Sequence, residues 1–338
     1  MQVLVTGGLG FLGRAVTLDL LAAGHQVTVL SRGGTDTRLP EGATLVHGDV
    51  RDRTRMIEIV AEGGFDGVCH LAALAHGRDS FAHPLAYFDV NVAGTLNLLL
   101  ALEAAKPATP PSFVFTSTNI VYGSVHTGAL AEDLEPHPES PYAESKLAAE
   151  RLVAAHAATG AVTATSLRLF NLAGAVDGVP DTDRTRIIPN ALRAAAGELD
   201  RVTLNGDGSA VRDFVHILDV ATVVRLALGR STAENTSAPD NGEPTPGSRP
   251  EAGSDGYRGP APHELYNIGS GTGSSMAEVV RVAREVTGVD FTVEHLPPKP
   301  EPQLLIADVR RAATGLGWVP TRSGLGELIE DAWRAWRG

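Results

Sequence analysis

Short apolar runs alternate with helix-like segments along the first half of the chain. The runs have the length and composition of buried strands, and they are Gln2–Thr6, Gln26–Leu30, Thr44–His47, Gly67–Leu71, Phe113–Thr116 and Ala164–Leu169. Between them apolar positions recur at helical spacing, in Arg14–Ala23, Arg53–Glu62, Pro84–Ala105 and Tyr142–Ala158. This alternation predicts an α/β fold with a doubly wound parallel sheet and right-handed crossovers.

A glycine-rich stretch, Thr6–Gly13 (TGGLGFLG), follows the first predicted strand directly and opens the first predicted helix. Strand, glycine turn and helix in this order form the context of a dinucleotide-binding Rossmann motif. The glycines allow a tight turn, a close approach to a pyrophosphate and close packing of helix on strand, while N–H groups at the helix start face the phosphates. The residues expected to serve this purpose are Gly7, Gly10, Phe11, Leu12 and Gly13. The alternative is a tight turn in an unrelated α/β protein.

The pattern becomes less regular after Phe170, where Pro and Gly are more frequent, and this predicts a second, smaller α+β lobe for the substrate. The expected Rossmann lobe comprises residues 1–170 with returns near 210–229 and 263–269, and the substrate lobe comprises residues 171–209 and 270–338. Residues 230–262 hold almost no large apolar side chain, so burial cannot offset their ordering entropy. We expect a flexible insertion there.

The composition of the chain excludes some classes of binding partner. The net charge of −12 argues against nucleic acid. No apolar run reaches the roughly 18 residues of a membrane-spanning helix, and the first strand leaves no room for a signal peptide. The single cysteine, Cys69, fits a reducing compartment and is expected to be a buried structural thiol. We therefore expect a cytoplasmic protein with no membrane partner, no nucleic-acid partner and no metal site.

The segment SPYAESK, which ends at Lys146, carries a second candidate motif. Ser140 and Pro141 predict a helix start, and Tyr142 and Lys146, four residues apart, then lie on one face. A nearby ammonium favours the phenolate, and a fall of about three units would bring the pKa of a tyrosine near neutrality. Such a tyrosine can exchange a proton during turnover. The alternative is an ordinary solvent-facing pair at helical spacing.

A third candidate element is Thr116-Ser117-Thr118, at the predicted carboxyl end of an apolar strand. Ligands of doubly wound sheets bind at the carboxyl ends of the strands. A hydroxyl there can bond a substrate oxygen, although alone this segment is only a polar strand end.

These elements, in this order and with these gaps, resemble the extended short-chain dehydrogenase/reductase superfamily, and most closely its nucleotide-sugar epimerases of the UDP-galactose 4-epimerase kind. The resemblance covers nearly the whole chain outside residues 230–262. Further matching segments are GDVRD from Gly48, HLAA from His70, NVAGTLNL from Asn91, FTSTNIVYG from Phe115, LRLFN from Leu167 and VRDFVH from Val211.

The resemblance implies roles for particular residues. Tyr142 would act as acid/base on a sugar hydroxyl, Lys146 would hold the nicotinamide ribose and lower the tyrosine pKa, and Thr118 would bond the same sugar oxygen. The implied cofactor-binding residues, in addition to those of the glycine turn, are Ser31, Arg32, Asp49, Val50, Leu71, Ala72, Ala73, Asn91, Thr116, Tyr142, Lys146 and Phe170. The implied substrate-binding residues are His76, Thr118, Asn171, Arg212 and Lys299.

Three departures from the family pattern matter. Ser31 and Arg32 stand where an NAD enzyme usually has an acidic residue, so either NADP binds there through its 2′-phosphate or Arg32 stacks on the adenine of NAD. Asn119 follows Thr118 where dehydratases carry an acidic pair, which argues against dehydration. The late arginine that grips the diphosphate is missing; Lys299 is a substitute, and Arg212, oriented by Asp213, is a second candidate unless it forms a purely structural ion pair.

The leading hypothesis is a nucleotide-sugar 4-epimerase that works through a 4-keto intermediate on a bound NAD. The alternative is an NADP(H)-dependent nucleotide-sugar 4-ketoreductase or dehydrogenase, which would consume external cofactor, and a third class is a non-catalytic dinucleotide sensor. We also expect a homodimer. The helices at 84–105 and 142–158 carry more apolar surface than one sheet face needs, and the resemblance pairs them across a two-fold axis.

Overall fold

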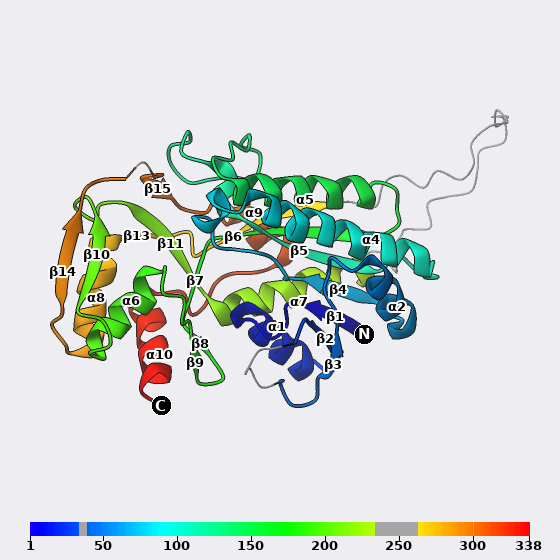
Figure 1. The fold of residues 1–338 in the computed structure, drawn as a ribbon, viewed down its shortest axis with the longest axis horizontal. Coiled ribbons are helices and arrows are strands. Elements are labelled where there is room, and N and C mark those ends of the chain that lie inside the picture. Colours follow the sequence, from blue (N-terminus) through cyan, green and yellow to red (C-terminus); the bar gives the residue numbers. More distant parts are fainter. Residues whose placement is uncertain (34–38, 234–262, 300) are drawn as a thin grey trace.

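The computed structural model describes residues 1–33, 39–233, 263–299 and 301–338, and in them a seven-stranded parallel sheet forms the centre of the larger lobe (Figure 1). Its order is β12-β6-β5-β4-β1-β2-β3. The strands are β1 (Gln2–Thr6), β2 (Gln26–Ser31), β3 (Thr44–His47), β4 (Gly67–His70), β5 (Ser112–Thr118), β6 (Thr163–Leu169) and β12 (Glu264–Ile268). The order reverses between β1 and β4, which is where such sheets bind ligands. The predicted doubly wound α/β fold is confirmed.

Both faces of this sheet are covered by helices, because alternate residues of each buried strand point to opposite sides. In β1, Val3 and Val5 pack toward α1 (Phe11–Ala22) and α7 (Ile217–Ala233). Leu4 packs with the opposite layer, formed by α2 (Arg53–Gly63), α4 (Gly94–Ala105) and α5 (Pro141–Ala157). Cys69 is fully buried on β4, and burial raises the pKa of its thiol to about 12, so the expected structural thiol is confirmed.

The single helix expected over 84–105 is interrupted. It consists of α3 (Pro84–Phe88), a π-helical turn η2 (Asp89–Ala93) and α4. The turn contains Asn91, whose side chain bonds the backbone of Leu74 and the hydroxyl of Ser145. These tertiary bonds hold the wider turn in place. By length and composition alone this stretch is the one candidate membrane-spanning helix in the described residues, yet half of it is buried inside the protein.

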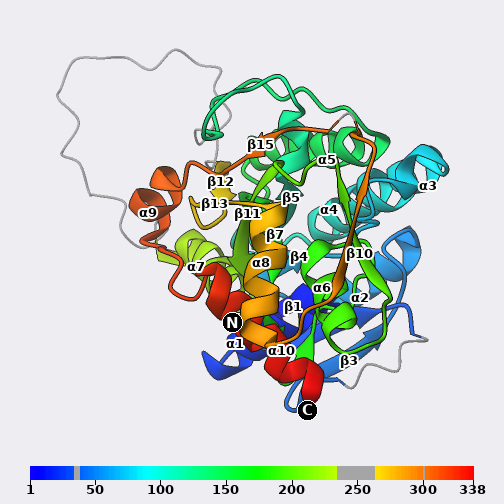
Figure 2. The ribbon, with the colours of Figure 1, turned by 90° about the vertical axis from the view of Figure 1, so that its left-hand side faces the viewer.

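The smaller lobe has its own sheets and its own apolar core, at the left of Figure 1 and facing the viewer in Figure 2. Its parallel pair is β10 (Arg201–Asn205) with β14 (Thr292–Leu296). A second sheet joins β11 (Val211–His216) to β7 (Asn171–Ala173), β13 (Gly273–Ser275) and β15 (Leu304–Leu305). The core lies between α6 (Ile187–Ala195), α8 (Met276–Thr287) and α10 (Leu325–Arg337). The remaining elements are η1 (Asp79–Phe81), η3 (Asn119–Tyr122), β8 (Ala175–Val176), β9 (Val179–Pro180) and α9 (Arg310–Leu316).

The chain passes between the lobes more than once. Strand β12 lies at the edge of the main sheet beside β6, α7 packs on α1, and β11 belongs to the sheet of the smaller lobe. The lobe boundaries stay a prediction. Residues 230–233, the start of the expected insertion, belong to α7, and the rest of it, 234–262, lies outside the described residues.

Candidate active site

The glycine turn between β1 and α1 leaves no room for side chains. Gly7 has φ +70°, and a Cβ there would lie 3.0 Å from the Cα of Ala72. Gly10 is the N-cap of α1 without a side-chain cap, and the first helical turn carries no acidic residue. A helix start with these properties is suited to the negative charge of a pyrophosphate. The turn therefore fits a dinucleotide.

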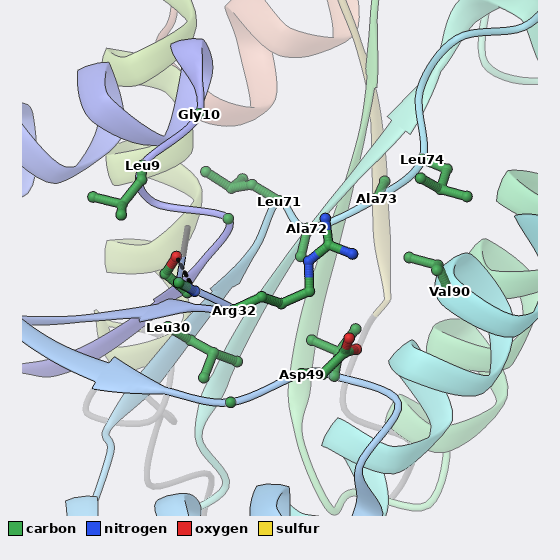
Figure 3. Close-up of a pocket in the computed structure, with 15 residues that line it drawn as sticks. Leu9, Gly10, Leu30, Arg32, Asp49, Leu71, Ala72, Ala73, Leu74 and Val90 are labelled. Carbon is green, nitrogen blue, oxygen red and sulfur yellow. Dashed lines mark hydrogen bonds between the residues drawn. The ribbon is translucent and has the colours of Figure 1, made fainter. Parts of the chain in front are cut away.

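A cavity of about 310 Å³ opens beside this turn, at the carboxyl ends of β1, β2 and β4 (Figure 3). Most of the residues that line it were expected from the sequence: Gly7, Gly10, Ser31, Arg32, Asp49, Val50, Leu71, Ala72 and Ala73. Six lining residues were missed: Leu9, Leu30, Gly33, Gly48, Leu74 and Val90. Each of these, including Val90 beside Asn91, directly neighbours an expected residue in the sequence, so only the local backbone geometry distinguishes them.

Charged groups gather at the adenosine end expected from the motif. In Figure 3 the Arg32 side chain reaches across the opening toward Ala72 and Ala73, with Asp49 on the adjoining loop. Arg51 donates to both carboxylate oxygens of Asp49, at 3.1 and 2.7 Å. This bond, more than the charge of Arg32, holds the pKa of Asp49 below its ordinary value. Asp49 is thus an anionic acceptor at the pocket wall.

A buried histidine ties the glycine turn to the helical layer. His70 lies between the hydroxyls of Thr6, at 2.7 Å, and Thr95, at 3.0 Å. The Thr95 hydroxyl donates to the carbonyl of Asn91 at 2.6 Å. Burial, reinforced by the charge of Lys146, lowers the pKa of His70 to about 3, so the ring is neutral.

The three expected catalytic residues converge at the end of β5 and the start of α5. Thr118 lies close enough to the Tyr142 phenol to lower its pKa. The Nζ atom of Lys146 lies 4.1 Å from the ring centre of Phe115, and Lys146 is only 3% exposed. The helix begins as predicted, with the Ser140 hydroxyl capping the N–H of Ala143.

The predicted fall in the tyrosine pKa is wrong for this structure. Burial raises the pKa of Tyr142, and Thr118 and the charge of Arg186 oppose that rise only in part. Burial also lowers the pKa of Lys146, to about 7. Sequence spacing does not give the depth of burial of the Tyr142 side chain, and this burial decides the direction of the shift in its pKa.

A cluster of charged side chains from the segment before α6, together with His76, lies near the tyrosine. The Nδ1 atom of His76 lies 3.7 Å from the carboxylate of Asp183. Arg186 bonds Asp181 at 2.9 Å and contacts Asp183 at 3.1 Å. The charge of Arg186 is felt at the phenol of Tyr142. His76 was expected here from the sequence, whereas Arg186 and its carboxylates were missed, because the segment before α6 has no periodic pattern.

The expected phosphate-binding residues are arranged differently from the prediction. Arg212 pairs with Glu301 at 3.1 Å, not with Asp213. Asp213 instead accepts backbone N–H bonds from residues 270, 271 and 307. The predicted orientation of Arg212 by Asp213 is therefore wrong, since Asp213 is a fully buried turn-forming group. Lys299 is exposed.

Several other residues expected at the site make structural contacts around the cavity and do not line it. Asn171 donates to the carbonyl of Asp213 at 3.0 Å and so joins β7 to β11. Thr116 donates to the carbonyl of His70 at 3.2 Å. Phe170 lies in a small buried cluster at the strand ends, and neither it nor Asn91 lines the cavity.

A model of the NAD dependent epimerase/dehydratase family matches residues 3–238. The chain belongs to this family. It is 35% identical to the UDP-glucose 4-epimerase of Corynebacterium glutamicum, over 98% of this chain and 95% of that protein. It is 33% identical to the UDP-glucose 4-epimerase of Streptomyces lividans over the same shares of the two chains.

Solved structures of the family have the same fold over the whole chain. The UDP-glucose 4-epimerase of Stenotrophomonas maltophila, with bound NAD and formylated UDP-arabinopyranose, gives a TM-score of 0.85 at 29% identity and covers 100% of this chain and 98% of that one. The UDP-glucose 4-epimerase of Thermus thermophilus, in complex with NAD, gives 0.82 at 30% identity, with 100% and 99% covered. The expected nucleotide-sugar 4-epimerase is confirmed, and the ketoreductase alternative is not favoured.

Proposed function

We propose that this epimerase interconverts UDP-glucose and UDP-galactose on a tightly held NAD. The observation that carries the proposal is the convergence of Thr118 and buried Tyr142, one helical turn from buried Lys146. The named activity of the relatives supports UDP as the carrier. NAD, rather than NADP, is favoured because the related structures hold NAD.

The residues around the glycine turn would hold the dinucleotide. The uncapped start of α1 takes the pyrophosphate, Asp49 and Arg32 take the adenosine end, and Lys146 takes the nicotinamide ribose. Bound NAD would supply the hydride acceptor and donor for sugar carbon 4. Arg32 is then an adenine-stacking residue, which is the NAD interpretation of the Ser31-Arg32 pair.

Tyr142 acts on the C4 hydroxyl of the sugar. As a phenolate it accepts the hydroxyl proton, and as a phenol it gives the proton back to the 4-keto sugar. Thr118 donates to the same oxygen and holds the phenol in place. Because burial raises the pKa of Tyr142, positive charge nearby is needed to make the phenolate accessible, and Arg186 is a group placed to supply it.

The test is conversion of UDP-galactose by the purified protein with no added nicotinamide cofactor, followed by proton NMR of the sugar. Steady approach to a mixture with UDP-glucose supports the proposal. Oxidation of UDP-galactose that consumes added NADP+ stoichiometrically would support the dehydrogenase/ketoreductase alternative instead, and bound dinucleotide without any turnover of UDP-sugars would support the sensor.

We also propose a homodimer formed through the face that carries α3 and α4. Large apolar side chains are exposed there, with Leu85 82% and Phe81 65% exposed. Sedimentation velocity at micromolar concentration should give a dimer, and Leu85→Glu should weaken it. A monomeric wild type would reject this assembly.

A further inference from the structure

A buried ion pair lies directly behind Lys146. Glu150 is one helical turn further along α5, on the same face. Its carboxylate accepts two bonds from Arg168 of β6, Nη2 to Oε1 at 2.6 Å and Nε to Oε2 at 3.2 Å. The side chains of Arg168 and Glu150 are only 3% and 6% exposed. Such a pair is costly to bury, and apolar residues often replace one without loss of stability, so stability alone does not account for it.

The position of Arg168 is fixed from its other side. Its guanidinium lies 4.7 Å from the ring centre of Tyr122. The Tyr122 hydroxyl in turn donates to Asn267 of β12 at 2.9 Å. With both carboxylate oxygens bonded to a fixed guanidinium, Glu150 is held one turn from Lys146 and kept from closing on it.

Few of the described groups around Lys146 favour its charge: the carboxylate of Glu150 does, and so does the ring face of Phe115. On its own helix are Tyr142 and Glu150; β4 contributes His70, which is neutral, and β6 contributes Arg168, which is cationic. The ring of Phe115 on β5 covers Nζ. Burial lowers the pKa of Lys146 to about 7, and the charge of Glu150 acts in the opposite direction.

We propose that Glu150, held by Arg168, is a positioning residue that presents Lys146 to the ribose side of the cofactor pocket as an ammonium ion. The inference rests on the proposed function only for the role of Lys146. Arg168 sets where the carboxylate sits, so that Glu150 supports the charge of Lys146 through space without occupying its N–H groups. Lys146 keeps those donors for the dinucleotide.

The chain suits a direct test because it has just three lysines: Lys106, Lys146 and Lys299. Full-length protein labelled with ¹³C at lysine Cε gives three signals, and the two exposed lysines serve as internal references. The titration of the Lys146 signal is followed by NMR from pH 5 to 11, before and after saturation with NAD. Wild type is compared with Glu150→Gln and Arg168→Met, each of which breaks the same ion pair.

The two variants should affect the Lys146 titration differently. Glu150→Gln removes the favourable charge, so the Lys146 midpoint should fall by about one pH unit. Arg168→Met frees the carboxylate to approach Lys146, so the midpoint should stay or rise. NAD retention at pH 8 should fall in both variants, in Glu150→Gln because Lys146 loses charge and in Arg168→Met because the freed carboxylate occupies its N–H groups. An unchanged midpoint in Glu150→Gln, or a midpoint that falls by a similar amount in both variants, would overturn the proposal.

A lone buried charge can prevent folding. If either single variant fails to fold, the double variant Glu150→Gln/Arg168→Met leaves no unpaired charge, and its Lys146 midpoint should still lie below that of wild type. Equality with wild type would again overturn the inference. The titration uses no UDP-sugar, so its failure and the failure of the proposed epimerase activity are separate results.

Discussion

The close packing of the glycine turn leads to a specific prediction for a substitution at Gly13. This residue is the third of α1, and a Cβ built on it would collide with the carbonyl oxygen of Gly7 and lie 2.5 Å from the Cα of Gly8. Both atoms belong to the backbone of the turn, so no side chain can rotate away. To restore ordinary contact the helix start must move by about 1 Å, away from the place where the pyrophosphate is expected.

Gly13→Ala should therefore destabilise the protein, although Gly to Ala inside a helix normally stabilises it by up to about 1 kcal/mol. Overpacking against fixed atoms costs about 1–3 kcal/mol, which exceeds that gain. The assays are thermal unfolding and NAD content per chain after acid release, and both should fall.

Gly326→Ala is the matched control, because Gly326 is exposed in α10 and a Cβ there meets nothing within 4 Å. This variant should melt at or slightly above wild type and keep its NAD. A Gly13→Ala protein with full NAD content and an unchanged melting temperature would refute the reasoning about the turn.

Three further predictions concern the residues around the cavity. Tyr142→Phe should lower kcat by about 10²–10⁴-fold while NAD content and melting temperature stay near wild type, and retained activity would remove Tyr142 from the mechanism. Arg186→Met should raise the phenol pKa, because the charge of Arg186 lowers it, and so move the acidic limb of the kcat profile to higher pH; a shift to lower pH would contradict this. The pKa of His70 is depressed to about 3, so its contribution to stability is present above the unfolded value near 6.5 and declines by about 1.4 kcal/mol per unit as pH falls toward 3. His70→Gln should flatten the dependence of melting temperature on pH in that range, relative to wild type, and an unaltered slope would count against a neutral buried ring.

The sequence was sufficient to predict the buried strands and the glycine turn, because local residue patterns determine both. Buried parallel strands read as continuous apolar runs, and the glycine turn depends on steric limits that residue type alone reveals. The interruption of the 84–105 helix at Asp89–Ala93 was not predictable in this way. An extra residue in one turn barely alters hydrophobic periodicity, and the bonds that hold Asn91 come from distant segments.

The pKa shifts and ion pairs of the site were harder to predict from the sequence than the residues that form it. Thr118, Tyr142 and Lys146 converge as expected, but the direction of the shift in the tyrosine pKa depends on the burial of its side chain, which spacing does not give. Arg212 likewise takes a partner, Glu301, that lies 89 residues away in the sequence. Glu150 is different: its spacing from Lys146 on one helix face is visible in the sequence, although its pairing with a residue of β6 is not.

In a 4-epimerase with bound NAD, the hydrogen that leaves sugar carbon 4 as hydride would return to the same carbon, while Tyr142 would exchange only the hydroxyl proton. UDP-galactose carrying deuterium at C4 tests this directly, with the protein as purified and no added cofactor. The account predicts UDP-glucose that keeps the deuterium at C4. Loss of the label to solvent, with conversion otherwise complete, would contradict it.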